Sequence, residues 1–336
     1  MKHSPSNKIK ARYLYLSSFL ILIGSFVHGM VTGASDIGLE ELFDTVINGN
    51  TDSPAANIFI YVRLPRVLAA AVCGAALSVS GAVIQGVLSN RLASPSIIGV
   101  NSGAGLAVTV CAALGTVGGW QLSLFAFLGA FLAVLPVVFG AKKWGASRGT
   151  VILIGVALNS FLGAISDTVV TFSPEVSISN SDFRIGDFSA VTYAKLIPAA
   201  TVIVISIVLL LTLSNELSVL TLGEEGAKGL GMNTGLARMI FLLLATLLSG
   251  CAVSICGLVS FVGLLIPHAV RRLARHNRHL IPLCALFGAG FVTLCDNLSR
   301  TLFSPYEIPV GIILAFLGAP FFIFILIKEK GDALDD

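Results

Sequence analysis

Long apolar segments recur along almost the whole chain, and they limit its fold more than any other feature. A helix needs about 20 apolar residues to cross the hydrocarbon core of a bilayer. Segments of this kind follow one another from Tyr13 to the C-terminus, with only short polar breaks. Charged residues make up 12% of the 336 residues, against about 25% in an average soluble domain. We therefore expect an all-α integral membrane protein with about ten transmembrane helices.

Hydropathy and helix-breaking residues together predict where these helices run. The ten expected spans lie near residues 13–31, 65–88, 96–114, 120–139, 150–172, 196–213, 237–256, 258–270, 280–303 and 308–327. The stretch 237–270 is too long for one perpendicular helix, so we expect a turn near Gly257, with a re-entrant segment as the alternative. For the first span the alternative is a cleaved signal peptide, but its apolar run is too long and no clear cleavage site follows. Residues 1–336 are thus expected to form one transmembrane domain.

The distribution of lysine and arginine predicts the orientation of the spans. Cytoplasmic loops of membrane proteins carry an excess of these residues. With a cytoplasmic N-terminus, 16 of the 21 lysines and arginines lie inside, and the five that lie outside are Arg63, Arg66, Arg184, Lys195 and Arg300. Because the number of spans is even, both termini are then cytoplasmic. We expect a multi-pass protein of a cell membrane, namely the bacterial cytoplasmic or inner membrane.

Small residues recur at intervals of four on several expected spans. In lipid, helices associate through small residues that let their backbones approach closely. The residues in question are Gly74, Ser78, Ala82 and Gly86 on the second span, Gly99 and Gly103 on the third, and Gly311 on the last. We interpret them as helix-packing residues. The alternative is that they line helices which slide past one another and border a pathway.

The chain lacks the residue patterns of an enzyme or a metal site. It has no phosphate-binding G-x-x-x-x-G-K-[ST] motif, and no nucleophile stands with a plausible base. Its six cysteines lie in apolar runs without a C-x-x-C pair, and its five histidines are scattered. We expect no catalytic residue, no cofactor and no metal ligand, and nothing suggests nucleic-acid binding.

Ionisable residues inside the expected spans are costly and therefore need partners or a function. Asp296 and Arg300 are four residues apart near the outer end of the ninth span, where an intrahelical ion pair lowers this cost. Asp167 lies near the outer end of the fifth span. We expect it to face a water-filled cavity.

Several motifs together resemble the FecCD family of binding-protein-dependent permeases. They begin with Arg63-Leu-Pro-Arg66, Gly74-Ala-Ala-Leu-Ser-Val-Ser-Gly81, Gln85-Gly86, Asn90-Arg-Leu-Ala-Ser-Pro95 and Gly99-Val-Asn-Ser-Gly103. They continue with Leu222-Gly-Glu224, Leu230-Gly231, Ser260-Phe-Val-Gly-Leu-Leu-Ile-Pro-His268, Glu307-Ile-Pro-Val-Gly311 and Gly318-Ala-Pro320. These motifs cover nearly all of the expected spans.

The resemblance implies the architecture of a type II ABC importer permease. Such a subunit dimerises with a second copy or a paralogue around a central pathway. Two separate ATPase subunits bind beneath it, and an extracytoplasmic substrate-binding protein docks above it. The substrates of the family are iron(III) siderophores, haem and cobalamin, and we expect an iron siderophore here. The first alternative is a haem or cobalamin permease of the same family. An ion-gradient-driven transporter, a membrane-embedded enzyme and a zinc or manganese permease are the others.

The resemblance also assigns roles to individual residues. Arg63, Arg66 and Arg300 match family arginines that face outward and pair with acidic residues of the binding protein. Residues 222–236 match the cytoplasmic coupling region, in which two short helices broken by glycine sit in a groove of the ATPase. The residues expected to contact the ATPase are Leu222, Gly223, Glu224, Glu225, Ala227, Leu230 and Gly231.

Two departures from the family pattern stand out. The family usually has Asn-Pro-Leu-Ala after the second span, whereas this chain has Asn90-Arg91-Leu92-Ala93 and loses the proline of that turn. The segment 183–188 lacks the tryptophans of many relatives. These departures weaken an assignment of the transported chelate by analogy.

Overall fold

The computed structural model describes residues 5–33, 53–115, 119–143, 148–274 and 277–332, and all regular elements within them are helices. The elements are α1 (Pro5–Val31), α3 (Pro54–Ile58), the π-helical turn η1 (Phe59–Arg63), α4 (Leu64–Leu88), α5 (Val100–Ala113), α6 (Gly119–Lys143), α7 (Arg148–Phe172), α8 (Glu175–Ser179), α9 (Ser181–Ile185), α10 (Tyr193–Thr212), α11 (Ser214–Thr221), α12 (Glu224–Gly229), α13 (Thr234–Cys256), α14 (Val262–Leu273), the 3-10 turn η2 (Asn277–His279), α15 (Leu280–Thr301) and α16 (Val310–Asp332).

Each of the ten expected spans corresponds to a helix. Seven helical stretches in the described residues are long and apolar enough to cross a membrane, and α5 and α16 contribute shorter apolar stretches. The predicted all-α, multi-span fold is confirmed. The third span begins later than expected, at Val100 instead of Ser96, because Pro95 and Gly99, with φ of 101°, form a turn before the helix.

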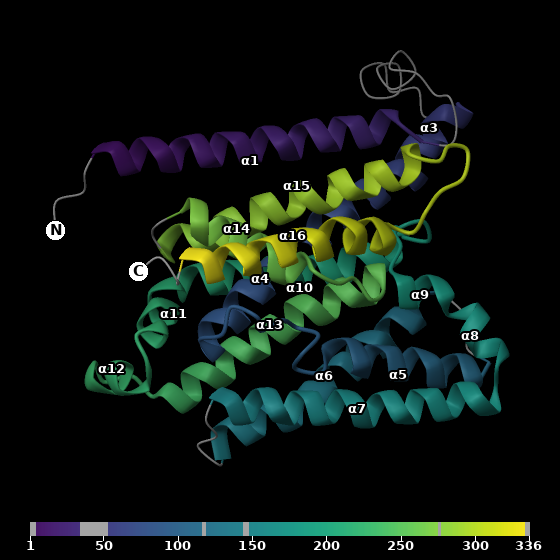
Figure 1. Ribbon diagram of the computed structural model, residues 1–336. Helices are drawn as coiled ribbons and strands as arrows, with labels where there is room; N and C mark the ends of the chain where they lie inside the picture. The colour runs from purple at the N-terminus through teal and green to yellow at the C-terminus, as the bar shows by residue number, and fades with distance from the viewer. Residues whose placement is uncertain (1–4, 34–52, 116–118, 144–147, 275–276, 333–336) are drawn as a thin grey trace.

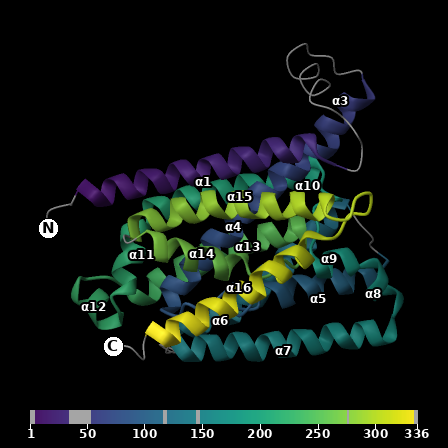
Figure 2. The same cartoon turned by 45° about the horizontal axis from the view of Figure 1, so that its top comes forward.

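The helices form one bundle with α4 and α13 at its centre. Of the most apolar stretch of each of these two helices, 78% of the residues are buried. The corresponding shares are 22% for α1 and 11% for α7. In two views of the molecule, α1 and α7 lie on opposite flanks of the bundle (Figures 1 and 2). A membrane protein needs apolar residues on such outer surfaces, since they face lipid or another membrane subunit.

Small residues lie where the central helices touch. An alanine Cβ at Gly74 would lie 2.8 Å from the Val292 Cβ and closer still to the Gly288 carbonyl oxygen, so α4 and α15 meet backbone to backbone. Gly103 similarly faces Gly129, and Gly311 faces the carbonyl oxygen of Ile185. Such approaches leave no room for a side chain.

The remaining small residues predicted from the four-residue spacing lie on α4 or directly before α5. Ser78 and Ala82 are fully buried within α4, and Gly86 faces Leu217 of α11. Gly99 has a positive φ and comes directly before α5.

The non-helical stretch before α5 is stabilised by a side chain from α7. The Asn159 amide donates hydrogen bonds to the carbonyl oxygens of Ser96 and Ile97, at 2.9 and 3.0 Å. Gly155, one turn earlier on α7, lets this segment approach closely. Non-helical backbone at membrane depth requires such internal partners, because lipid offers none.

A second non-helical stretch separates α13 from α14 at the expected turn. Gly257 has a φ of 74°, and the Leu258 amide donates to the Phe183 carbonyl oxygen at 2.8 Å. The Asp187 amide in return donates to the Cys256 carbonyl oxygen at 2.9 Å. With 12 residues, α14 spans only about 18 Å, so it crosses part of a bilayer.

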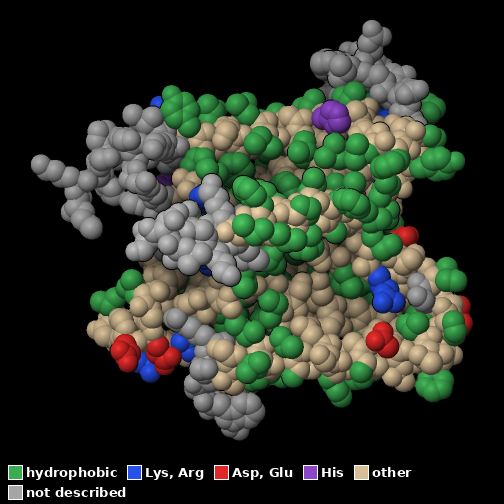
Figure 3. Space-filling model, in the orientation of Figure 1, with side chains coloured by type: hydrophobic (Ala, Val, Ile, Leu, Met, Phe, Trp, Pro, Cys, Tyr) green, Lys and Arg blue, Asp and Glu red, His purple; other side chains and the backbone are tan. Residues whose placement is uncertain are grey.

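The bundle has two distinct ends (Figure 1). At one end, called the α12 end here, lie α11, α12, the start of α1 and the end of α16. At the other, the α8 end, lie α3, α8 and α9. On the face shown in Figure 3, apolar side chains cover the middle, and the charged side chains gather towards the two ends.

Candidate functional site

Two of the three predicted docking arginines bind the last carbonyl groups of α1. The Arg63 guanidinium donates to the carbonyl oxygens of Met30 and Val31, at 2.8 and 2.6 Å. The Arg300 guanidinium donates to those of Gly29 and Thr32, both at 3.2 Å. The end of a helix carries unpaired carbonyl groups and a partial negative charge, so cations stabilise it. These arginines therefore fix the end of α1 to α4 and α15.

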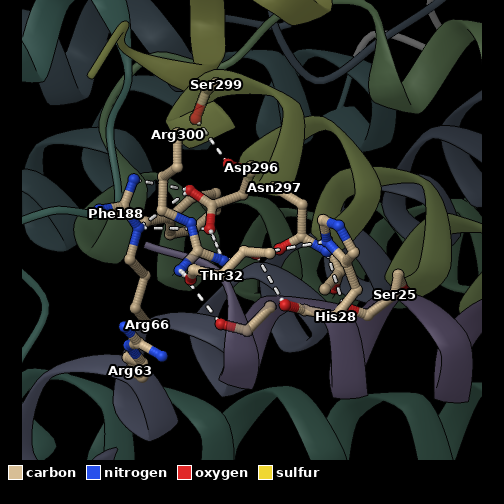
Figure 4. A network of polar contacts seen from close by, with 12 residues as sticks. Ser25, His28, Thr32, Arg63, Arg66, Phe188, Asp296, Asn297, Ser299 and Arg300 are labelled. Carbon is tan, nitrogen blue, oxygen red and sulfur yellow. Dashed lines mark hydrogen bonds and ion pairs between the residues drawn. The ribbon is translucent and has the colours of Figure 1, made fainter. Parts of the chain in front are cut away.

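Asp296 lies between two arginines inside this cluster (Figure 4). Its carboxylate accepts from Arg66 at 3.1 Å and pairs with Arg300 at 3.4 Å. The side chains of all three residues are 7% exposed or less. The predicted pair of Asp296 and Arg300 is thus present, with Arg66 as an additional partner from α4. A buried carboxylate between two guanidinium groups is stable because each charge has a hydrogen-bonded counterpart.

Glu307 completes the cluster from the loop between α15 and α16. Its carboxylate accepts a hydrogen bond from Arg66 at 2.6 Å, and its side chain is 32% exposed. We call Arg66, Asp296, Arg300 and Glu307 the ion cluster. It carries two positive and two negative formal charges, and it joins α4, α15 and the loop at the α8 end.

The three arginines were expected to face outward and pair with a binding protein, and the structure places all three at the α8 end with buried side chains. Arg63, Arg66 and Arg300 are 3%, 6% and 3% exposed. The sequence argument placed them on the outer side by the distribution of cations and by the family resemblance. It could not show that the end of α1 and Asp296 lie close enough to bind them. Their docking role stays a prediction.

At the α12 end, two short helices lie between α10 and α13, and the leucine that follows each of them is exposed. Leu222 follows α11, Leu230 follows α12, and each is 67% exposed. Gly223 and Gly231 have φ of 105° and 80°, a conformation that favours glycine, and they turn the chain before and after α12. These two leucines therefore expose apolar side chains just before and just after α12, where a partner can contact them.

Glu224 ties α12 to the first turns of α13. Its carboxylate accepts from Lys228 at 2.9 Å and from Arg238 at 3.0 Å. The hydrogen bond from Lys228 and then the contact with Arg238 lower the pKa of Glu224. The Arg238 side chain is 7% exposed, whereas that of Lys228 is 60% exposed. Of the other predicted coupling residues, Ala227 is fully buried, and Glu225 is exposed.

A cavity of about 200 Å³ lies where the two non-helical stretches meet α4. Its lining includes Leu77, Ser94, Ser96, Asn101, Ser260 and Phe261. The wall is partly polar, through hydroxyl and amide groups, and these side chains carry no formal charge. In the described residues, no group of three or more His, Cys, Asp or Glu residues could hold a metal ion.

Sequence reasoning missed several residues that hold these sites together. Arg238 was seen only as one of many cytoplasmic cations, although its spacing from Glu224 across a glycine-bounded helix was a usable signal. Asn159 gave no signal, because its carbonyl partners are about sixty residues away. Glu307 was noted only as part of a motif, and nothing in the sequence indicated that it would bind Arg66.

At Asn90 the chain compensates for the missing proline of the family pattern. Ser89 ends α4 in a left-handed conformation, and the Asn90 side-chain oxygen accepts a hydrogen bond from the Leu92 amide at 2.9 Å. This arrangement is an Asx turn, which reverses the chain without proline.

Comparison with known proteins places this chain among membrane permeases. The model of the FecCD transport family matches residues 20–328. The chain is 36% identical to the Fe(3+)-citrate import system permease protein of Bacillus subtilis (strain 168), over 98% of this chain and 99% of that protein. It is 34% identical to the hemin transport system permease protein of Yersinia pestis, over 90% and 92%.

A solved structure agrees with these relatives. An inward-facing conformation of a putative metal-chelate type ABC transporter superimposes with a TM-score of 0.81 and 31% identity, over 95% of this chain and 99% of that one. The expected ABC importer permease architecture is therefore confirmed. On the family match over most of its length, this chain is a member of the FecCD transport family.

Proposed function

We propose that this chain is the permease subunit of an ATP-driven importer that moves an iron(III)-siderophore complex across a cell membrane. ATP is hydrolysed on two separate ATPase subunits, and a substrate-binding protein delivers the complex. Haem and cobalamin are the alternative substrates within the same family. The similarity to permeases named for Fe(3+)-citrate and hemin supports a metal chelate as the cargo.

The exposed surface of α11 and α12 carries the proposal. Leu222 and Leu230 are 67% exposed at the end of the bundle that holds the described ends of the chain (Figure 1). If this end is cytoplasmic, as the lysine and arginine distribution predicts, these leucines face water unless a partner covers them. An ATPase subunit is the partner that an importer permease requires at this position. We propose that movement of residues 222–231 tilts α13 and opens the pathway alternately to the two sides.

A second permease subunit is proposed to cover the flank formed by α7. Only 11% of the residues in the most apolar stretch of α7 are buried, and Asp167 on this helix is exposed. A carboxylate on the lipid-facing surface of a spanning helix would be costly. A water-filled pathway between two subunits, bordered by α7, would give Asp167 a polar environment. The small residues Gly99, Gly103 and Gly311 are proposed to allow the neighbouring helices to shift.

The binding protein is proposed to dock at the α8 end through Arg63, Arg66 and Arg300. Guanidinium groups suit the carboxylates of a partner, because two parallel hydrogen bonds can form. All three lie at the same end of the bundle, which supports the proposal. They are buried in this conformation, so docking requires that at least one of them becomes accessible.

Uptake by the reconstituted importer tests the proposal. The permease is co-expressed with its ATPase subunits, reconstituted into vesicles, and supplied with the loaded binding protein. A panel of ferric hydroxamate, ferric citrate, haem and cobalamin then identifies the cargo. We expect uptake of a ferric siderophore that depends on ATP. Uptake that needs an ion gradient but no ATP would favour a secondary transporter instead.

A further inference from the structure

Glu307 is the only member of the ion cluster with substantial access to solvent. The side chains of Arg66, Asp296 and Arg300 are 7%, 0% and 2% exposed, against 32% for Glu307. An incoming group from the solvent therefore meets Glu307 first. Asp296 cannot be displaced in the same way, since it is fully buried between two guanidinium groups.

The bonds of Arg66 differ in how easily they can be exchanged. Its Nε and one terminal nitrogen bind Asp296, while its other terminal nitrogen binds Glu307 at 2.6 Å. Glu307 lies in residues 302–307, all of which are exposed. The loop is fixed just after it, where the Ile308 amide donates to the Ser299 carbonyl oxygen at 3.0 Å. The Glu307 side chain can therefore swing outward without unwinding α15 or α16.

We propose that Glu307 is an internal latch that occupies the place of a carboxylate of the substrate-binding protein. In the free permease, Glu307 covers the terminal nitrogen of Arg66 that does not bind Asp296. On docking, an acidic side chain of the binding protein replaces it there, and Glu307 moves into solvent. Exchange of one carboxylate for another keeps Arg66 paired throughout, so a buried cation is never left without a counterion. The latch rests on the proposed docking of a binding protein.

The first experiment needs no partner. The arginine-directed reagent phenylglyoxal is applied to the full chain in detergent, and modification of Arg66 is measured by mass spectrometry. We compare Glu307→Ala with Asp182→Ala, which removes the same charge from α9 at the same end without touching Arg66. Modification of Arg66 should rise on the order of tenfold in Glu307→Ala, as for loss of one charged hydrogen bond, and stay unchanged in Asp182→Ala. Equal reactivity in both variants would overturn the latch.

The second experiment uses the substrate-binding protein of the importer, labelled with a fluorophore. Its affinity for the reconstituted importer should be higher for Glu307→Ala than for Asp182→Ala, again on the order of tenfold. An affinity that falls, or that rises equally in both variants, contradicts the latch. If the binding protein fails to bind the wild-type importer, the proposed function fails instead, so the two outcomes are distinct. Thermal unfolding of both variants checks that each is folded.

Discussion

The ion pair between Glu224 and Arg238 leads to a specific prediction about what holds α12 against α13 at the α12 end. Glu224 has two cationic partners, and only Arg238 belongs to the central helix α13. We predict that Glu224→Gln releases α12 from α13, whereas Lys228→Met does not. Lys228→Met removes only the partner of Glu224 within α12 and leaves the pair with Arg238 intact, so it controls for loss of the contact inside α12.

The size of the effect follows from the geometry. Two unit charges 3.0 Å apart attract by about 1.4 kcal/mol in bulk water and by about 5.5 kcal/mol at an effective dielectric of 20. The Glu224 side chain is 44% exposed, so solvent screening places the contribution near the lower value, about 1–2 kcal/mol. Loss of the tie should raise the ratio of released to docked α12 by a factor of about 5–30. The pair with Lys228 lies on the surface and contributes about 0.3–0.5 kcal/mol.

Amide hydrogen exchange of residues 224–231 in the reconstituted permease measures this release. We expect exchange to be about 5–30 times faster in Glu224→Gln and to change by less than about threefold in Lys228→Met. In the proposed mechanism the ATPase moves α13 through α12, so substrate moved per ATP hydrolysed should fall in Glu224→Gln alone. Unchanged exchange and unchanged coupling in Glu224→Gln would refute this reasoning.

Three further predictions follow from other contacts. Asp296→Asn leaves two buried guanidinium groups without their shared carboxylate, so thermal unfolding should show a loss of about 3–5 kcal/mol. Gly74→Ala should cost about 1–3 kcal/mol because its Cβ overlaps α15, whereas Gly163→Ala points into open space and should gain up to about 1 kcal/mol. Folding lowers the pKa of Glu224 below its ordinary value of 4.5. The ion pair with Arg238 therefore contributes fully above that pH and is lost as the pH falls through the lowered pKa. Between about pH 6 and 8, amide exchange of α12 should not depend on the ionisation of Glu224.

The spans were predictable because lipid imposes a simple rule on sequence. Every backbone polar group in the hydrocarbon core must find an internal partner, so apolar segments of sufficient length become helices. The turn at Gly257 was also predictable from the length of residues 237–270. The start of α5 was not, because Asn159 supplies hydrogen bonds to Ser96 and Ile97 that let non-helical backbone persist inside the bundle.

The ion cluster was only partly visible in the sequence. The pair of Asp296 and Arg300 follows from helical spacing, since residues four apart share one face. The contact of Arg66 with Asp296 joins residues 230 positions apart, and no local pattern encodes it. The same holds for Arg63, which binds the end of α1. Long-range contacts of this kind decide whether an arginine near the end of an expected span is exposed or buried.

Uptake in vesicles is the most direct measurement of the proposed mechanism. The permease is reconstituted with its ATPase subunits, the binding protein loaded with a radiolabelled ferric siderophore is placed on the side of the α8 end, and uptake is followed with ATP or with an ion gradient alone. We predict that the siderophore accumulates only when ATP is present on the side of the α12 end. No accumulation is expected when the ATPase subunits are omitted. Accumulation driven by the permease alone under an ion gradient would contradict an ATP-driven importer.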